Sequence, residues 1–174
     1  MHIQVLVIAG AMGVGKTAVM AEASDLLTDA EIIHGAIDAD ALGLAHVPER
    51  PDGLELRNLK CVSTNYLAAG VERILIACAV ESIDERERIR AAAGSEHLTV
   101  CRLIASPDTA RRRLRARETG VFQDRYLRRA RELDQILDAA ALEDFRVDND
   151  DRAITDVARE VLVRAGWLTG PVSR

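Results

Sequence analysis

Short apolar runs alternate with amphipathic stretches along the chain. The apolar runs are rich in Val, Ile and Leu, and they are continuous rather than interrupted at every second position. Continuous runs are typical of strands in a parallel sheet that is covered on both faces. They predict strands over residues 3–9, 31–37, 73–80, 98–105 and 145–147.

The amphipathic stretches between these runs have a helical period. They predict helices over residues 16–27, 54–69, 83–92, 108–118, 126–141 and 154–165. Strands that alternate with helices predict an α/β fold, a doubly wound three-layer α/β/α sandwich around a five-stranded parallel sheet.

Prolines and glycines support these boundaries. Pro107 suits the first turn of a helix, and Asp150 or Asp151 can cap the last helix. Residues 43–53 contain two prolines and predict an irregular connection where a substrate would enter. Glycines stand where three helices should end, at Gly70, Gly94 and Gly166.

The segment GAMGVGKT, which joins the first predicted strand to the first predicted helix, has the pattern of a phosphate-binding loop. Gly10, Gly15, Lys16 and Thr17 satisfy every fixed position of that pattern. Backbone N–H groups of such a loop point at phosphate oxygens, and the helix that follows adds its positive end. We expect Lys16 to reach the β and γ phosphates, and Thr17 to coordinate Mg²⁺.

A chance match in a glycine turn is the alternative, but a strand before the motif and a helix after it are the context that confirms it. We therefore expect ATP or GTP to contact one continuous segment: Gly10, Ala11, Met12, Gly13, Val14, Gly15, Lys16, Thr17 and Ala18.

Two aspartates follow the second predicted strand in the sequence IDAD. The carboxyl ends of parallel strands are where open α/β sheets bind ligands, so Asp38 and Asp40 should lie beside the phosphate loop. Asp38 is our candidate catalytic base, which would take the proton of an attacking hydroxyl. Both residues are substrate candidates, although a turn or capping role is as good an interpretation for Asp40. His34, within the same strand, is interpreted as a packed histidine.

The segment from residue 111 to residue 131 contains nine arginines and two acids, which gives it a net charge of +7. In an acidic protein this predicts a local anion site. A polar stretch inside it, about residues 117–127, is our predicted lid, which would close over the transferred phosphoryl group. Arg113 and Arg117 lie one turn apart on one helix face, and we expect both, with Arg125, to contact phosphate. Arg113 and Arg117 are expected to act in catalysis, Arg113 also to bind the nucleotide, and Arg125 to contact substrate. The remaining interpretation is a solvated helix face, for Arg111, Arg112, Arg115, Arg129 and Arg131.

Length and charge limit the remaining possibilities. The 174 residues suit one domain, residues 1–174, and the net charge of −5 argues against a general nucleic-acid or membrane binder. Three scattered cysteines predict buried free thiols of a reducing compartment, and the short apolar start does not resemble a signal peptide. We expect a cytoplasmic protein, as a monomer or homodimer.

The phosphate loop, the IDAD strand end, the R-L-x-x-R helix at residues 113–117 and the closing segment VDNDDRAITDVAREVL together resemble the small P-loop kinases of nucleotides and metabolites. Shikimate kinase, gluconate kinase and chloramphenicol phosphotransferase are examples. The resemblance implies a P-loop NTPase fold with strand order 2-3-1-4-5. It also implies that Asp148, Asn149 and Arg152 lie near the nucleotide base. The phrase HGAID resembles the chloramphenicol phosphotransferase strand that carries the proposed base, which corresponds to Asp38.

These observations predict an enzyme that moves the γ-phosphoryl group of ATP or GTP, with Mg²⁺, to a hydroxyl of a small molecule, either a metabolite or an antibiotic. Arg57 could face this acceptor or lie on the surface. One alternative is a nucleotide kinase, whose phosphate acceptor would need a basic pocket, whereas residues 43–53 offer only Arg50. The other is a nucleotide-dependent regulatory module. The third strand ends in ACAVES, without the acidic ending that often holds magnesium in such kinases.

Overall fold

All five predicted strands form one parallel sheet in the order β2-β3-β1-β4-β5, as the resemblance implied. The computed structural model describes residues 3–46, 48–49, 51–117, 120 and 123–170. The strands are β1 (Gln4–Ala9), β2 (Gly35–Asp38), β3 (Arg73–Ala77), β4 (His97–Ile104) and β5 (Phe145–Asp148).

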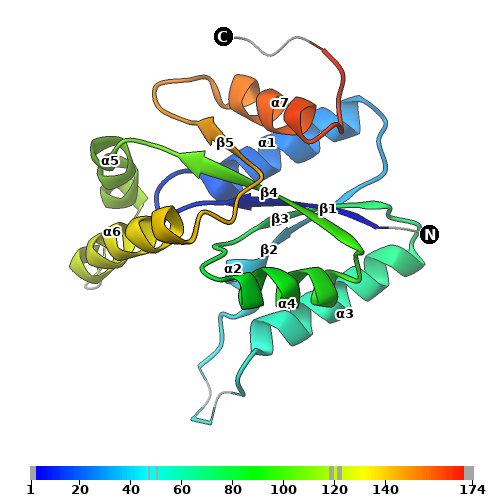
Figure 1. The fold of residues 1–174 in the computed structure, drawn as a ribbon, viewed down its shortest axis with the longest axis horizontal. Coiled ribbons are helices and arrows are strands. Elements are labelled where there is room, and N and C mark those ends of the chain that lie inside the picture. Colours follow the sequence, from blue (N-terminus) through cyan, green and yellow to red (C-terminus); the bar gives the residue numbers. More distant parts are fainter. Residues whose placement is uncertain (1–2, 47, 50, 118–119, 121–122, 171–174) are drawn as a thin grey trace.

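Helices cover both faces of this sheet and give the predicted three layers (Figure 1). One face carries α1 (Lys16–Asp29) and α7 (Ile154–Arg164), and the other carries α3 (Leu54–Ala68) and α4 (Ile83–Ala93). Beyond the end of β4 lie two further helices, α5 (Pro107–Arg117) and α6 (Gln123–Ala140).

The central strand β1 supplies side chains to the hydrophobic cores on both faces. Leu6 and Ile8 pack in the core beneath α1 and α7, while Val5 and Val7 pack in the core beneath α3 and α4. All four side chains are at most 2% exposed. Burial on both faces explains why the sequence of this strand is a continuous apolar run.

The region around β2 differs from the prediction. The strand begins at Gly35 rather than at residue 31. Glu31, with a left-handed φ of 56°, belongs instead to the turn that ends α1, where its N–H donates to the Thr28 carbonyl oxygen. His34 is packed as expected, with one ring nitrogen 2.7 Å from Ser24 Oγ and the other 2.8 Å from the Ile32 carbonyl oxygen. A short helix, α2 (Ala39–Leu42), follows β2 and was not predicted.

Two smaller predictions were wrong. Cys61 is exposed on α3, whereas Cys78 and Cys101 are buried as expected. Neither Asp150 nor Asp151 caps α7, whose N-cap is Ala153. Within the described part of the chain, no helix combines the length and the apolar character that crossing a membrane requires.

Candidate active site

The loop between β1 and α1 forms a tight cradle. Gly15 is the N-cap of α1 with a φ of 101°, and Gly13 has a φ of 85°, which are conformations that favour glycine. A Cβ atom at Gly13 would lie 2.6 Å from the Ala110 carbonyl oxygen, and one at Gly15 would lie 2.7 Å from Asn149 Nδ2. Both positions therefore need glycine because of the packing around the loop as well as its turn.

The carbonyl oxygen of Val14 ties this loop to two distant segments. Asn149 Nδ2 donates to it over 2.7 Å, and Arg113 Nη1 donates to it over 3.2 Å. Arg113 Nη2 also donates to the Asn149 carbonyl oxygen over 2.9 Å. Because Asn149 is only 4% exposed, its amide supports the loop from behind. The structure thus brings two predicted site residues, Arg113 and Asn149, onto the same loop atom.

Lys16 and Thr17 begin α1, and each lies near one carboxylate, from Asp40 in α2 and from Asp38 at the end of β2. The buried Lys16 has its Nζ atom 3.9 Å from Asp40 Oδ2. Thr17 Oγ1 donates to Asp38 Oδ2 over 2.9 Å. The other oxygen of Asp38 accepts from the backbone N–H of Ala41 over 3.4 Å and caps α2. The two aspartates are therefore held in different surroundings.

The loop and these side chains line a cavity of about 630 Å³, which we call the phosphate cavity. Gly10, Ala11 and Val14 lie behind its surface and shape the loop from within. Two residues that the sequence did not predict, Ala21 and Leu114, also line it. The predicted residues that line it are Met12, Gly13, Gly15, Lys16, Thr17, Ala18, Asp38, Asp40 and Arg113.

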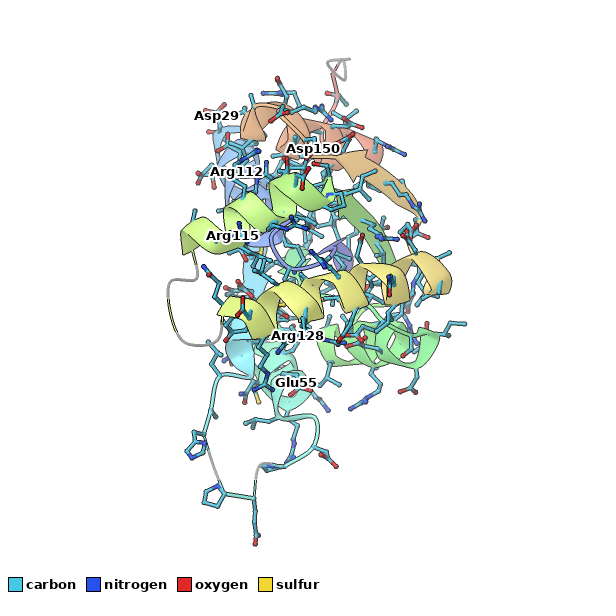
Figure 2. The ribbon with its side chains drawn as sticks, turned by 90° about the vertical axis from the view of Figure 1, so that its left-hand side faces the viewer. Asp29, Glu55, Arg112, Arg115, Arg128 and Asp150 are labelled. Carbon is cyan, nitrogen blue, oxygen red and sulfur yellow. The ribbon has the colours of Figure 1, made fainter. Side chains whose placement is uncertain are left out.

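A second cavity of about 200 Å³, which we call the acidic cavity, shares Asp40 with the first. It lies between the start of α3, the segment after β3, and α4. Leu56, Leu59 and Ile89 form much of its apolar surface. Figure 2 shows Glu55 at the start of α3, below α5 and α6 in that view. The charged residues that line it are Asp40, Glu55, Glu81, Glu85 and Arg88.

Ionisation of groups in the acidic cavity reflects burial and negative surroundings. Burial raises the pKa of the Cys78 thiol, and the carboxylates of Asp40 and Glu85 raise it further, so this thiol stays protonated near neutral pH. Burial also raises the pKa of Glu85, with a smaller upward contribution from Glu81. A hydrogen bond from the Glu81 backbone N–H acts in the opposite direction.

The arginine-rich segment does not form one anion site in the described residues. Arg113 reaches the loop, whereas Arg125 and Arg128 line a separate depression of about 620 Å³ that meets the loop at Met12. Arg129, which lines the same depression, pairs with Glu81 over 2.7 Å. Figure 2 shows Arg112 and Arg115 on α5 and Arg128 on α6.

The predicted lid, residues 117–127, is described only in part. Arg117 is the last residue of α5, and its side chain lies outside the described residues, as do residues 118–119 and 121–122. Residues 123–127 form the first turns of α6, so this helix begins three residues before the predicted position 126.

Arg57 and Arg152, both predicted contact residues, line neither the phosphate cavity nor the acidic cavity. Arg57 is exposed and donates to the Asp52 carbonyl oxygen over 3.1 Å. Arg152 donates to the Asp148 carbonyl oxygen over 3.0 Å and to Glu160 Oε2 over 2.8 Å, which stabilises the connection between β5 and α7. Their roles at the acceptor and at the nucleotide base stay predictions.

Asp150 was predicted to cap the last helix, α7, but it contacts the start of α5 instead. Its Oδ2 atom accepts from the Ser106 backbone N–H over 2.7 Å, at the start of α5. Burial acts to raise its pKa, but the hydrogen bonds from Ser106 and Thr109 and the nearby Arg113 guanidinium lower it on balance. Asp150 therefore fixes the helix that carries Arg113.

Sequence reasoning found Asp40 but missed the other three carboxylates of the acidic cavity, Glu55, Glu81 and Glu85. Glu81 follows β3 within ACAVES, so the rule that ligands bind at the carboxyl ends of parallel strands could have indicated it. Glu55 and Glu85 lie on α3 and α4, and no local pattern marks the faces on which they meet.

Neither a family model nor a curated protein matches this sequence. Solved structures do match. A gluconokinase from Sinorhizobium meliloti 1021 is 19% identical, with 94% of this chain and 91% of that chain covered and a TM-score of 0.61. A tunicamycin resistance protein from Deinococcus radiodurans is 15% identical, with 98% and 99% covered and a TM-score of 0.67.

A shikimate kinase from Acinetobacter baumannii, solved in complex with shikimate, is 19% identical, with 97% of this chain and 96% of that chain covered and a TM-score of 0.61. Identities this low establish the fold alone. The chain has the P-loop fold that these proteins share, with the predicted strand order.

Proposed function

We propose that this protein transfers the γ-phosphoryl group of ATP or GTP to a hydroxyl group of a small molecule. The observation that carries the proposal is the position of Asp40, which lines both the phosphate cavity and the acidic cavity. A carboxylate at that junction stands where a nucleotide on the loop and an acceptor in the neighbouring cavity would meet. The small-molecule kinases among the similar structures support this reading.

Positive groups around the loop would bind the nucleotide phosphates. Lys16 and the N-terminus of α1 supply positive charge to the β and γ phosphates. The guanidinium of Arg113, held at the loop by the Val14 and Asn149 carbonyl oxygens, supplies more. Charge placed in advance stabilises the transition state without reorganisation during the reaction.

The residues beside the loop fit a magnesium ion. The hydroxyl of Thr17 and the carboxylate of Asp38 provide oxygen atoms, the ligand type that Mg²⁺ prefers, and they are 2.9 Å apart. When bound, Mg²⁺ would neutralise charge on the phosphates. Because both oxygens of Asp38 already accept hydrogen bonds from the chain, we assign Asp38 to orienting Thr17 and the metal's surroundings.

This assignment revises the expected base from Asp38 to Asp40. In the proposed reaction, the acceptor hydroxyl oxygen forms a bond to the γ phosphorus as the bond between that phosphorus and the bridging oxygen of the nucleoside diphosphate breaks. Asp40 takes the proton of the hydroxyl and releases it to solvent. The nucleoside diphosphate leaves with the electron pair of the broken bond.

An acceptor that is itself a phosphate is less well supported. The acidic cavity has four carboxylates and one guanidinium among its described lining residues. The carboxylates would repel the phosphate of a nucleoside monophosphate. Metabolites and antibiotics both stay candidates, since the similar structures include a gluconokinase and a tunicamycin resistance protein.

The first test measures ADP and GDP formation with and without hydroxyl-bearing metabolites and antibiotics. We expect an acceptor to stimulate turnover, and Lys16→Ala to lower it by about a hundredfold or more. If no acceptor stimulates turnover and the bound nucleotide changes only the affinity for a partner protein, the chain is a regulatory module and not a kinase.

The second test separates the two aspartates. Asp40→Asn should lower kcat by about a hundredfold or more, with unchanged affinity for nucleotide and Mg²⁺. Asp38→Asn should instead raise the Mg²⁺ concentration for half-maximal rate by about tenfold or more. Normal kcat in Asp40→Asn would remove this residue as the base, and a loss of kcat in Asp38→Asn at saturating Mg²⁺ would restore the original assignment.

A further inference from the structure

A further cavity, which we call the interhelical cavity, lies between α5 and α6, apart from the cavities of the proposed reaction. Figure 2 shows these two helices one above the other, with Arg115 labelled on α5 and Arg128 on α6. The volume of the interhelical cavity is about 370 Å³. Sites for small molecules commonly measure ~300–1,000 Å³, so this cavity is large enough for one.

Most residues that line the interhelical cavity are apolar. Ala110 and Leu114 line it from α5, Leu127 and Ala130 line it from α6, and Ala105 lines it just after β4. Such a lining offers water few hydrogen bonds, so an apolar group that displaces the water is stabilised. A mainly apolar surface with a few polar groups is also the usual composition of a ligand site.

The phosphate loop forms another part of the wall. Ala11 and Val14 lie behind the surface of the phosphate cavity but line the interhelical cavity. Met12 and Leu114 line both cavities, and Leu114 is 1% exposed. A molecule between the two helices would therefore contact the loop without entering the phosphate cavity.

Two arginines, one from each helix, give the interhelical cavity a positive charge. Arg131, on α6, has no hydrogen-bond or ion-pair partner among the described residues. Arg111, on α5, has its Nη1 atom 3.8 Å from Asp108 Oδ1, but the Asp108 side chain is 89% exposed. Water screens a pair of this kind, so Arg111 keeps most of its attraction for an anion.

No free carboxylate balances these arginines among the lining residues that the structure describes. Asp134 is the one acid in that lining, and its Oδ1 atom already accepts from Arg102 Nη2 over 2.9 Å. Gln135, which also lines the cavity, is neutral. The cavity thus complements a molecule that has an apolar body and one negative group.

We propose that the interhelical cavity binds a small amphipathic anion, with a ring system or short aliphatic chain as its apolar body and a carboxylate as its charged group. The apolar body packs against Leu114, Leu127 and the phosphate loop. Arg111 and Arg131 are the residues assigned to the carboxylate. This site is separate from those of the nucleotide and the acceptor, and it does not depend on the proposed function.

Two matched sets of probes test the chemistry of this ligand. The first set is indole-3-acetate, 3-methylindole and tryptamine, and the second is octanoate, 1-octanol and octylamine. Isothermal titration calorimetry should show one site per chain that binds each anion at least about fivefold more tightly than its neutral and cationic counterparts. Counterparts that bind as tightly as the anions, or anions that show no saturable binding, would overturn the proposal.

Competition with nucleotide locates the bound probe. ATP should not displace indole-3-acetate, because the interhelical cavity and the phosphate cavity share walls and not space. Complete displacement by ATP would place the probe in the phosphate cavity and contradict the proposal.

Charge variants test the two arginines. Arg111→Gln and Arg131→Gln should each weaken indole-3-acetate binding by about fivefold and leave 3-methylindole binding unchanged. Arg115→Gln removes the same charge from an exposed position of α5 that does not line the cavity, and should change neither affinity. A loss in Arg115→Gln as large as in the other two variants would show that overall charge, and not this cavity, sets the preference.

A variant that fills the cavity gives an independent measurement. Ala110→Leu places a larger side chain in the space and should weaken the binding of every probe by at least about tenfold. Ala116→Leu adds the same bulk at an exposed position of α5 outside the lining and should have no effect. Melting temperatures show whether both variants fold. Unchanged binding in a folded Ala110→Leu protein overturns the proposal, and if that variant does not fold, the arginine variants decide.

Discussion

At the scale of single residues, the Val14 carbonyl oxygen is where three parts of the chain meet. It accepts from Arg113, 99 positions later in the sequence, and from Asn149, 135 positions later. The neighbouring Gly15 leaves the space that the Asn149 amide occupies. The loop is thus held in shape by residues that the phosphate-loop motif does not contain.

Gly15→Ala should therefore disable the loop by displacing Asn149. The added Cβ would lie 2.7 Å from Asn149 Nδ2, which would have to move away from the Val14 carbonyl oxygen. Losing a buried hydrogen bond of this kind costs about 1–3 kcal/mol, so nucleotide affinity should fall by about tenfold to a hundredfold. Isothermal titration calorimetry measures the change.

Gly94→Ala is the control for this variant. Gly94 also has a positive φ, 71°, but a Cβ there meets nothing within 4 Å. Alanine at this position therefore introduces comparable backbone strain, of about 1 kcal/mol, without a steric clash. It should lower thermal stability and leave nucleotide affinity unchanged, and an equal loss of affinity in both variants would show that backbone strain alone explains the effect.

The phosphate-loop pattern places Lys16 and Thr17 at the start of the first helix by their spacing, where the structure has them, and their contacts with phosphate and metal stay predictions. It could not separate Asp38 from Asp40, since their surroundings depend on α2, a helix of four residues that carries no periodic signal. Once Asp38 caps that helix, its carboxylate turns to Thr17 and Asp40 faces the cavities.

At the scale of elements, one buried arginine joins α6 to the sheet, in addition to the core packing of Leu133 and Leu137. Arg102 on β4 is 2% exposed and pairs with Asp134 over 2.9 Å and with Asp138 over 2.8 Å, both from α6. The two carboxylates are about half exposed, so water hydrates them from the other side. The pairing therefore combines one buried charge with two that are accessible.

Because the arginine is buried and its two partners are not, removing the arginine and removing the aspartates should lower the free energy of unfolding by different amounts. The double variant Asp134→Ala/Asp138→Ala leaves the Arg102 guanidinium buried without a counter-charge, and should lower the free energy of unfolding by about 3–5 kcal/mol. Arg102→Met removes the buried charge and leaves carboxylates that water can hydrate, so we expect a cost of about 1 kcal/mol. Urea denaturation measures both values. An Arg102→Met variant that is the less stable of the two would contradict the explanation.

The types of nearly all elements could be predicted, because strands and helices of this length carry their own apolar period and end at glycine or proline. The arginine-rich segment could be predicted in part. Its spacing assigned Arg113 to the loop and Arg112 to a solvated face, and the structure agrees, because Arg113 donates to the Val14 carbonyl oxygen while Arg112 lies 3.7 Å from Asp151. The separate depression lined by Arg125, Arg128 and Arg129 could not be predicted, because it depends on how α6 packs beside the loop. The acidic cavity was also missed, since it combines the ends of four elements.

At the scale of the whole molecule, nucleotide should stabilise the fold in a magnesium-dependent manner. With ATP and Mg²⁺ at about a hundred times the dissociation constant, binding to the folded state adds about 2.7 kcal/mol. For a chain of this size the melting temperature should rise by about 5–10 °C. Differential scanning fluorimetry measures the shift.

Two comparisons sharpen this prediction. Chelation of Mg²⁺ with EDTA should reduce the shift in the unmodified protein, while Thr17→Val should show the same small shift with and without EDTA, because it lacks the hydroxyl assigned to the metal. A full Mg²⁺-dependent shift in Thr17→Val would remove Thr17 from the metal site.

The bond between Asn149 and Val14 also has a consequence for how the protein is made. The central strand β1 pairs with β3 and β4, and neither exists when β1 leaves the ribosome. Asn149, which holds the loop after β1, is synthesised 135 residues after Val14. Contacts this distant in sequence form late in folding. Nascent chains that end before residue 149 should therefore have little affinity for ATP, and the proposed binding of nucleotide should become possible only after most of the sequence has been synthesised.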